Sequence, residues 1–125
     1  MSELLLTIPD EWWISSNKRY HYHDKAVRTK AIRTYAAVQS RNAHLTVPPQ
    51  VHIAIYVGYP TKAKADPPNA WPTAKAAIDG IVDAGTLADD NSEIVYCHSF
   101  LRDPKKAPAK HHTLRFVLTD QALEF

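Results

Sequence analysis

The chain has 125 residues, of which 45% are hydrophobic and 22% are charged, with one cysteine and a formal net charge of +2. This length suits a single domain, residues 1–125, whose core needs no structural metal, and the lone Cys97 excludes an intramolecular disulfide. The N-terminal segment lacks the features of a secretory signal, and no stretch approaches the roughly 20 apolar residues of a membrane span, so we expect a cytoplasmic protein.

The first half of the chain predicts a strand, a helix and a second strand. Apolar residues alternate over 4–8, which is typical of a short strand. A helical pattern follows over 24–41, with Asp24 as the expected N-cap. Four residues form its expected apolar stripe: Val27, Ala31, Tyr35 and Val38. Strict alternation over 51–58 then predicts the clearest strand of the chain.

The second half predicts one more helix and two more strands. The segment 59–71 is too rich in Pro and Lys for a regular element. The helix begins near Pro72 and is closed by Gly85. Its core-facing residues are expected to be Ala74, Ile78, Ile81 and Val82. Strand-like residues follow at 93–101 and 112–119. The order β-α-β-α-β-β predicts an α/β (α+β) sandwich in which a mixed sheet packs with two helices.

Charge is distributed unevenly along the chain. Residues 1–65 hold nine Lys/Arg and four Asp/Glu, whereas residues 66–92 hold one Lys and five Asp. A basic body with one acidic segment is typical of nucleases, in which cations contact phosphates and carboxylates hold a metal. Chance clustering on solvated faces explains the same distribution equally well. Two basic segments are candidates for phosphate contacts: Lys25, Arg28, Lys30 and Arg33 on the first helix, and Lys105, Lys106 and Lys110 in a later loop.

Four aspartates lie around the second predicted helix: Asp66, Asp79, Asp89 and Asp90. Phosphodiester hydrolysis requires charge neutralisation and a hydroxide, and Mg²⁺ or Mn²⁺ supplies both when two or three carboxylates hold it. The turns at the two ends of this helix lie about 18–20 Å apart along its axis. Asp66 and Asp90 therefore meet only if the flanking segments fold back, with Asp79 between them as a metal ligand. The alternative is four surface aspartates at turns and helix ends.

Lys75 stands four residues before Asp79, which is the spacing of an ion pair on one helix face. The pair is either an ordinary exposed ion pair or a cation that orients the carboxylate for chemistry. Spacing alone does not decide between the two.

Other chemistries find little support in the sequence. His21 and His23 would share a strand face, but no CxxC or HExxH spacing indicates zinc. Ser99 beside His98 lacks the GxSxG elbow of a serine hydrolase. Only three glycines are present, so a Gly-rich phosphate loop for ATP or a dinucleotide is not expected.

The segment DPPNAWPTAKAAIDGIVDAGTLADDNSEIV resembles the RusA family of Holliday junction resolvases. The family has an Asp-rich turn ending in Asn, a helix with Lys and Asp four apart, a Gly-containing turn, a paired Asp-Asp and a strand. These features match Asp66 and Asn69, Lys75 and Asp79, Ala84-Gly85, and Asp89-Asp90. The N-terminal segment is similar to the family's opening strand and SxN loop, here residues 15–19, and the order of elements agrees from about residue 3 to 119.

This resemblance implies a homodimeric, Mg²⁺-dependent endodeoxyribonuclease that nicks opposing strands of a four-way DNA junction in recombination and repair. It implies a phage or prophage protein, and so a bacterial or phage-infected host cytoplasm. Asp66 and Asp90 would be catalytic, with Lys75 as the helper lysine. The metal ligands would come from Asp66, Asp79, Asp89 and Asp90. The DNA contacts would include Asn17, Lys18, Arg19 and Asn69.

Two departures from the family pattern concern the metal site. Pro68 stands where the family commonly has a second Asp, and about three residues are inserted between Asn69 and Lys75. The site is then rebuilt around Asp79 or Asp89, or its activity is weak. Three other functions remain open: a non-catalytic DNA-binding protein of the same fold, a nuclease for flaps, forks or RNA, and a protein-interaction module.

Overall fold

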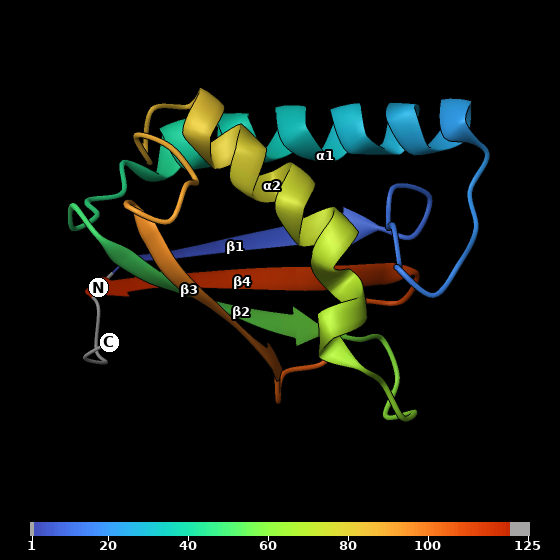
Figure 1. Cartoon of the computed structure of the whole chain (residues 1–125). Coiled ribbons are helices and arrows are strands. Elements are labelled where there is room, and N and C mark those ends of the chain that lie inside the picture. The colour runs from blue at the N-terminus through green and yellow to red at the C-terminus, as the bar shows by residue number, and fades with distance from the viewer. Residues whose placement is uncertain (1, 121–125) are drawn as a thin grey trace.

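A four-stranded sheet with two helices on one of its faces makes up the fold (Figure 1). The computed structural model describes residues 2–120; the predicted bounds 1–125 extend to Met1 and residues 121–125, outside the described part. The elements are β1 (Ser2–Pro9), α1 (Tyr22–Ala43), β2 (Val51–Gly58), the short 3₁₀ helix η1 (Pro67–Ala70), α2 (Trp71–Asp83), β3 (Val95–Arg102) and β4 (His111–Asp120). The predicted α+β class, element order and mixed sheet are confirmed.

The strand order is β1-β4-β2-β3, and the start of α2 lies at the end of β2 (Figure 1). β4 pairs antiparallel with both β1 and β2, whereas β2 and β3 are parallel. Parallel strands need a crossover connection, and η1 and α2 provide it. The segment that carries the aspartate motif is therefore the link between two neighbouring strands.

The core lies between the sheet and the two helices. Along β1, β2 and β4 the buried apolar residues alternate with less buried ones, and they include Leu6, Ile55 and Phe116, as the alternating pattern predicts. Gly80 lets α2 approach α1 closely, because a Cβ there would lie 2.3 Å from the carbonyl oxygen of Arg33. Neither helix in residues 2–120 combines the length and the apolar character needed to cross a bilayer.

The predicted start and buried face of α1 are wrong. The helix begins at Tyr22 with His21 as N-cap, so Asp24 lies inside the first turn, and His21 and His23 do not share a strand. Its buried residues are Ile32, Ala36, Ala37 and Ser40. Val27 is 68% exposed and Val38 is 43% exposed. Ala36 and Ala37 lie against Gly80 of α2, so the buried face is turned away from Val27 and Val38, whereas Ala31 and Tyr35 of the predicted stripe are half-buried.

The predicted course of α2 is largely confirmed. Pro72 stands in the first turn, and Ala74, Ile78 and Ile81 are buried, although Val82 is only half-buried. The helix ends in a Schellman motif, in which the N–H groups of residues 85 and 86 donate to the carbonyls of residues 82 and 81. Gly85 has φ +81°, which explains why a glycine closes this helix. The segment predicted as irregular contains η1.

Candidate functional site

The aspartate–lysine cluster, defined as Lys75, Asp79 and Asp90, joins two residues of α2 to one residue of the loop that follows the helix. Lys75 Nζ donates to Asp79 Oδ1 at 2.8 Å and also contacts Asp90 Oδ2. The loop after α2 therefore folds back beside the helix, as a site that includes Asp90 requires. All three side chains keep some solvent exposure, between 27% and 43%.

The opposite charges of Lys75 and Asp90 stabilise each other's charged form. The hydrogen bond from Lys75 lowers the pKa of Asp90, and the hydrogen bonds to Asp79 and Asp90 raise the pKa of Lys75. Both carboxylate and ammonium are thus held in their charged forms at neutral pH. His98 packs nearby, with its ring edge-on to Trp71 at 5.1 Å, and burial lowers its pKa.

Asp89 hydrogen-bonds to its own loop and has no described contact with Lys75. Its Oδ1 accepts a hydrogen bond from the Asp90 N–H at 2.7 Å, and its Oδ2 accepts one from Asn91 Nδ2 at 3.2 Å. Such bonds to the neighbouring backbone are typical of aspartate in turns. Asp89 therefore fixes the loop that presents Asp90.

The η1 groove is a hollow of about 240 Å³. It is lined by residues of the loop after β1 and by residues of the Asp66–Asn69 turn. Its charged, amide and aromatic residues are Trp13, Asn17, Lys18, Tyr59, Lys64, Asp66, Asn69 and His112. Ser16 joins its two walls: the Ser16 N–H donates to the Asn69 carbonyl at 2.9 Å, and Ser16 Oγ bonds to Asn69 Oδ1 at 3.0 Å. The SxN loop and the Asp66–Asn69 turn are therefore neighbours, although about 50 residues separate them in the sequence.

The four aspartates do not converge on one point. Within residues 2–120 no three His, Cys, Asp or Glu side chains are grouped so that they could hold one ion. Asp66 faces the η1 groove, whereas Asp79 and Asp90 contact Lys75. Two prolines start η1 directly after Asp66 and fix the backbone there, and Pro68 itself has no side-chain oxygen to offer.

Asp79 and Asp90 offer the carboxylate oxygens that Mg²⁺ or Mn²⁺ prefers. Mg²⁺ commonly takes one or two protein carboxylates and fills its other positions with water and substrate phosphate. The two carboxylates are gathered by one ammonium group, and each has a second oxygen besides the one that contacts Lys75. The donor chemistry therefore fits a hard dication at this pair.

The basic residues predicted to contact phosphate fall into two groups. Arg28 holds the loop after β1, because its Nη1 donates to the carbonyls of Asp10 and Trp13. Arg33 pairs with Asp83 of α2 through two hydrogen bonds of 2.6 and 2.8 Å, which lower the pKa of Asp83. The second group, with Asn17 added to the basic residues, is exposed: Asn17, Lys18, Arg19, Lys25, Lys30, Lys105, Lys106 and Lys110.

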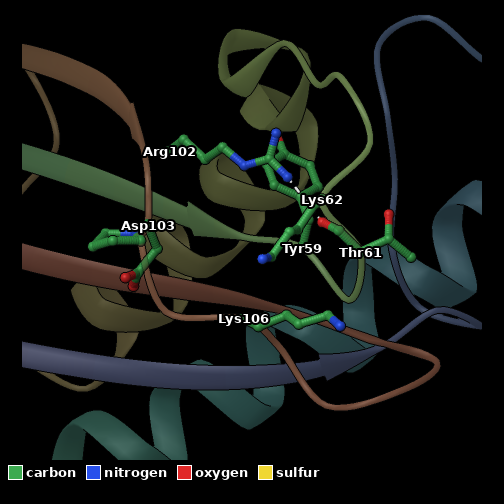
Figure 2. A pocket seen from close by; sticks show the side chains of 7 residues that line it. Tyr59, Thr61, Lys62, Arg102, Asp103 and Lys106 are labelled. Carbon is green, nitrogen blue, oxygen red and sulfur yellow. Dashed lines mark hydrogen bonds between the residues drawn. The ribbon is translucent and has the colours of Figure 1, made fainter.

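A second hollow, of about 360 Å³, adjoins the η1 groove, and Tyr59 lines both. Figure 2 shows its lining side chains, which come from the segment after β2 and from the end of β3 with the following loop. The Arg102 guanidinium lies 4.9 Å from the centre of the Tyr59 ring and donates to the carbonyls of Thr61 and Ala63. Lys62 and Lys106 add two further cations. Of these residues, sequence reasoning had singled out Lys106 alone.

Sequence reasoning also missed His112 and Asp10. His112 lines the η1 groove, and its Nδ1 lies 2.8 Å from Asp10 Oδ1. The two residues are 102 positions apart, so no local spacing joins them. The only signals in the sequence were an adjacent pair of histidines and a polar residue after the first strand.

The chain was also compared with known proteins. No model of a protein family matches it, and no curated protein matches its sequence. The residues described above, and their geometry, are therefore what supports any assignment of function.

Proposed function

We propose that this protein is a Mg²⁺- or Mn²⁺-dependent endonuclease that nicks branched DNA, with four-way junctions as its main substrate. The observation that carries the proposal is the contact of Lys75 with both Asp79 and Asp90, on a helix that directly follows the groove-lining residues Asp66 and Asn69. These are the positions at which the chain resembles the RusA family. The compartment we propose is a bacterial or phage-infected cytoplasm.

Each residue of the site has a role that its surroundings support. Asp79 and Asp90 would hold the ion, which when bound neutralises charge on the phosphate oxygens and makes water more acidic. Lys75 keeps Asp90 ionised and adds a positive charge close to the carboxylates. Lys18 and Lys64 line the groove where a phosphate backbone would lie, and Asp66 would accept hydrogen bonds from water there.

A homodimer is part of this proposal, because cutting two strands of a symmetric junction calls for two sites related by a two-fold axis. The outward apolar stripe of α1 is the surface that we propose for it. Trp12, Tyr35 and Ala31 lie beside the exposed Val27 and Val38 there. Apolar side chains in contiguous exposed patches are typical of interfaces between subunits.

The direct test is cleavage of a synthetic four-way junction in Mg²⁺, in Mn²⁺ and in EDTA, with a linear duplex of the same sequence as competitor. We expect nicks in the junction with either metal, none in EDTA, and little competition from the linear duplex. Equal cleavage of both DNAs would leave a nuclease without junction preference. No cleavage of either would contradict the nuclease proposal.

A second candidate is a non-catalytic DNA-binding protein of the same fold. It is favoured by the position of Lys75, whose ammonium group contacts both Asp79 and Asp90 and so competes with a metal ion for these carboxylates. In this case binding of the junction would be salt-dependent, indifferent to EDTA and unaccompanied by nicks at any metal concentration. The same assay, with binding measured alongside cleavage, separates the two candidates.

A further inference from the structure

His112 lines the η1 groove, and the carboxylate of Asp10 contacts one of its two ring nitrogens. Its Nδ1 lies 2.8 Å from Asp10 Oδ1. An ionised carboxylate can only accept a hydrogen bond, so Nδ1 must donate. The lone pair of the neutral ring is then on Nε2, which is the nitrogen that remains for a proton transfer.

The His112 ring is fixed on several sides. It stacks on Trp13, with ring centres 4.3 Å apart and planes 13° apart, and meets Tyr59 edge-on at 5.5 Å. Only 18% of the side chain is exposed. Arg28 in turn holds the loop that carries Asp10 and Trp13. A ring that is positioned in this way needs little reorganisation before it reacts.

The electrostatic surroundings keep this ring neutral at pH 7. Burial lowers the pKa of His112, the hydrogen bond from its ring to Asp10 raises it in part, and Lys18 lowers it further. The other charged or titratable groups that face it or share its groove are Tyr59, Lys64 and Asp66. A neutral histidine with a free lone pair is suited to accept a proton.

We propose that His112 is the general base for phosphodiester hydrolysis in the η1 groove, with Asp10 as its positioning residue. The inference rests on the proposed nuclease function and adds a proton acceptor to it. His112 Nε2 takes a proton from a water molecule as the water oxygen forms a bond to phosphorus. The bond from phosphorus to one sugar oxygen breaks, its electron pair stays on that oxygen, and solvent protonates it. His112 then returns its proton to solvent.

The experiment compares cleavage rates of the wild-type protein, His112→Ala and His111→Ala on the four-way junction. His111 is the matched control, because it is the adjacent histidine and its Nδ1 bonds to the Ala109 carbonyl. We expect His112→Ala to cleave about 10²-fold or more slowly, with unchanged junction binding, and His111→Ala to stay near the wild-type rate. Added imidazole should restore part of the rate in His112→Ala only.

The pH profile is a readout that a purely structural histidine would not move. The wild-type cleavage rate should fall at acidic pH as His112 becomes protonated. This acid limb of the pH profile should be lost in His112→Gln. The same variant replaces His112→Ala in the rate comparison if His112→Ala fails to fold. Since Asp10 raises the pKa of His112, Asp10→Asn should move the acid limb to lower pH. Ring ¹⁵N NMR of the wild-type protein without metal, under conditions in which it does not cleave, should show that His112 carries its proton on Nδ1.

The outcomes separate this inference from the proposed function. If the wild-type protein cleaves and His112→Ala cleaves equally well, the general-base role is overturned and the nuclease stands. A loss that imidazole does not restore and that leaves the acid limb in place in His112→Gln also overturns it, because His112 is then only a packing residue. If the wild-type protein cleaves no branched DNA, both proposals fall.

Discussion

Asp66, Asp79 and Asp90 have different surroundings, and these decide how their variants should differ. Asp79 and Asp90 share Lys75, whereas Asp66 lies in the η1 groove. Sequence reasoning expected Asp66 and Asp79 to hold the same ion. We now expect Asp79→Asn to raise the Mg²⁺ concentration for half-maximal cleavage, because the ion loses one of two carboxylates.

Asp66→Asn should instead slow cleavage at saturating Mg²⁺. It should change the Mg²⁺ concentration for half-maximal cleavage less than Asp79→Asn does. A metal titration of the two variants side by side measures both effects. Near-normal Mg²⁺ dependence in Asp79→Asn would leave that residue as an ordinary ion-pair partner of Lys75, worth only a few tenths of a kcal/mol.

His98 and His112 should make the stability of the protein pH-dependent. Burial lowers the pKa of both in the folded state. Below the ordinary histidine pKa of about 6.5, the unfolded chain binds protons that the folded chain resists. The free energy of unfolding therefore falls as the pH drops through this window, until the lowered pKa values are passed.

Urea unfolding at neutral and mildly acidic pH measures this effect. We expect a lower midpoint at the acidic pH, and a smaller decrease in His98→Gln, which cannot take up a proton. A midpoint that does not change between the two pH values would contradict the lowered pKa values.

At the scale of elements, the contact of α1 with α2 depends on Gly80. A Cβ at this position would lie 2.3 Å from the Arg33 carbonyl oxygen and 2.9 Å from the Ala36 Cβ. Gly80→Ala should therefore lower the free energy of unfolding by about 1–3 kcal/mol. Gly85→Asn is the control, since its position is open and asparagine tolerates the left-handed conformation. Equal stability of Gly80→Ala and wild type in urea would show that the helices can separate freely.

The strands were predictable and the orientation of α1 was not, for a physical reason. A strand that is buried on one face alternates with period two, and β2 shows this from Val51 to Val57. α1 carries apolar residues on two faces, and the stripe from Val27 to Val38 looked like the buried one, although both of its ends are exposed and only Ala31 and Tyr35 between them are half-buried. The close approach of α2 selects small residues instead, and that approach depends on Gly80, which lies far away in sequence.

The candidate site was predictable where its residues are near in sequence or belong to the family pattern. Spacing indicated Lys75 with Asp79, and the resemblance added Asp90, which contacts the same lysine. The separation of Asp66 from this pair depends on how η1 begins, which the sequence did not reveal. The contact of Asp10 with His112 depends on the pairing of β1 with β4, so only the folded sheet shows it.

At the scale of the whole molecule, the proposed homodimer can be tested by changing the exposed apolar residues of α1. Val27→Glu or Val38→Glu would place a charge in the proposed interface, which costs far more in a buried interface than on a solvated helix. We expect these variants to be monomers by light scattering, with unchanged folding, while the wild type is a dimer. Exposed Thr34 on the same helix offers a control, Thr34→Ser. A monomeric wild type that still makes paired nicks would contradict the dimer.

The central claim is that carboxylates gathered by Lys75 support cleavage of branched DNA. Asp90→Asn removes one of these carboxylates, and Asp83→Asn removes a carboxylate at the end of α2 that pairs with Arg33 instead. Cleavage and binding of a four-way junction in Mg²⁺ should be measured for both variants beside the wild type. We expect Asp90→Asn to bind the junction and not to cut it, and Asp83→Asn to do both. Wild-type turnover by Asp90→Asn, with an unchanged melting temperature, would contradict the claim.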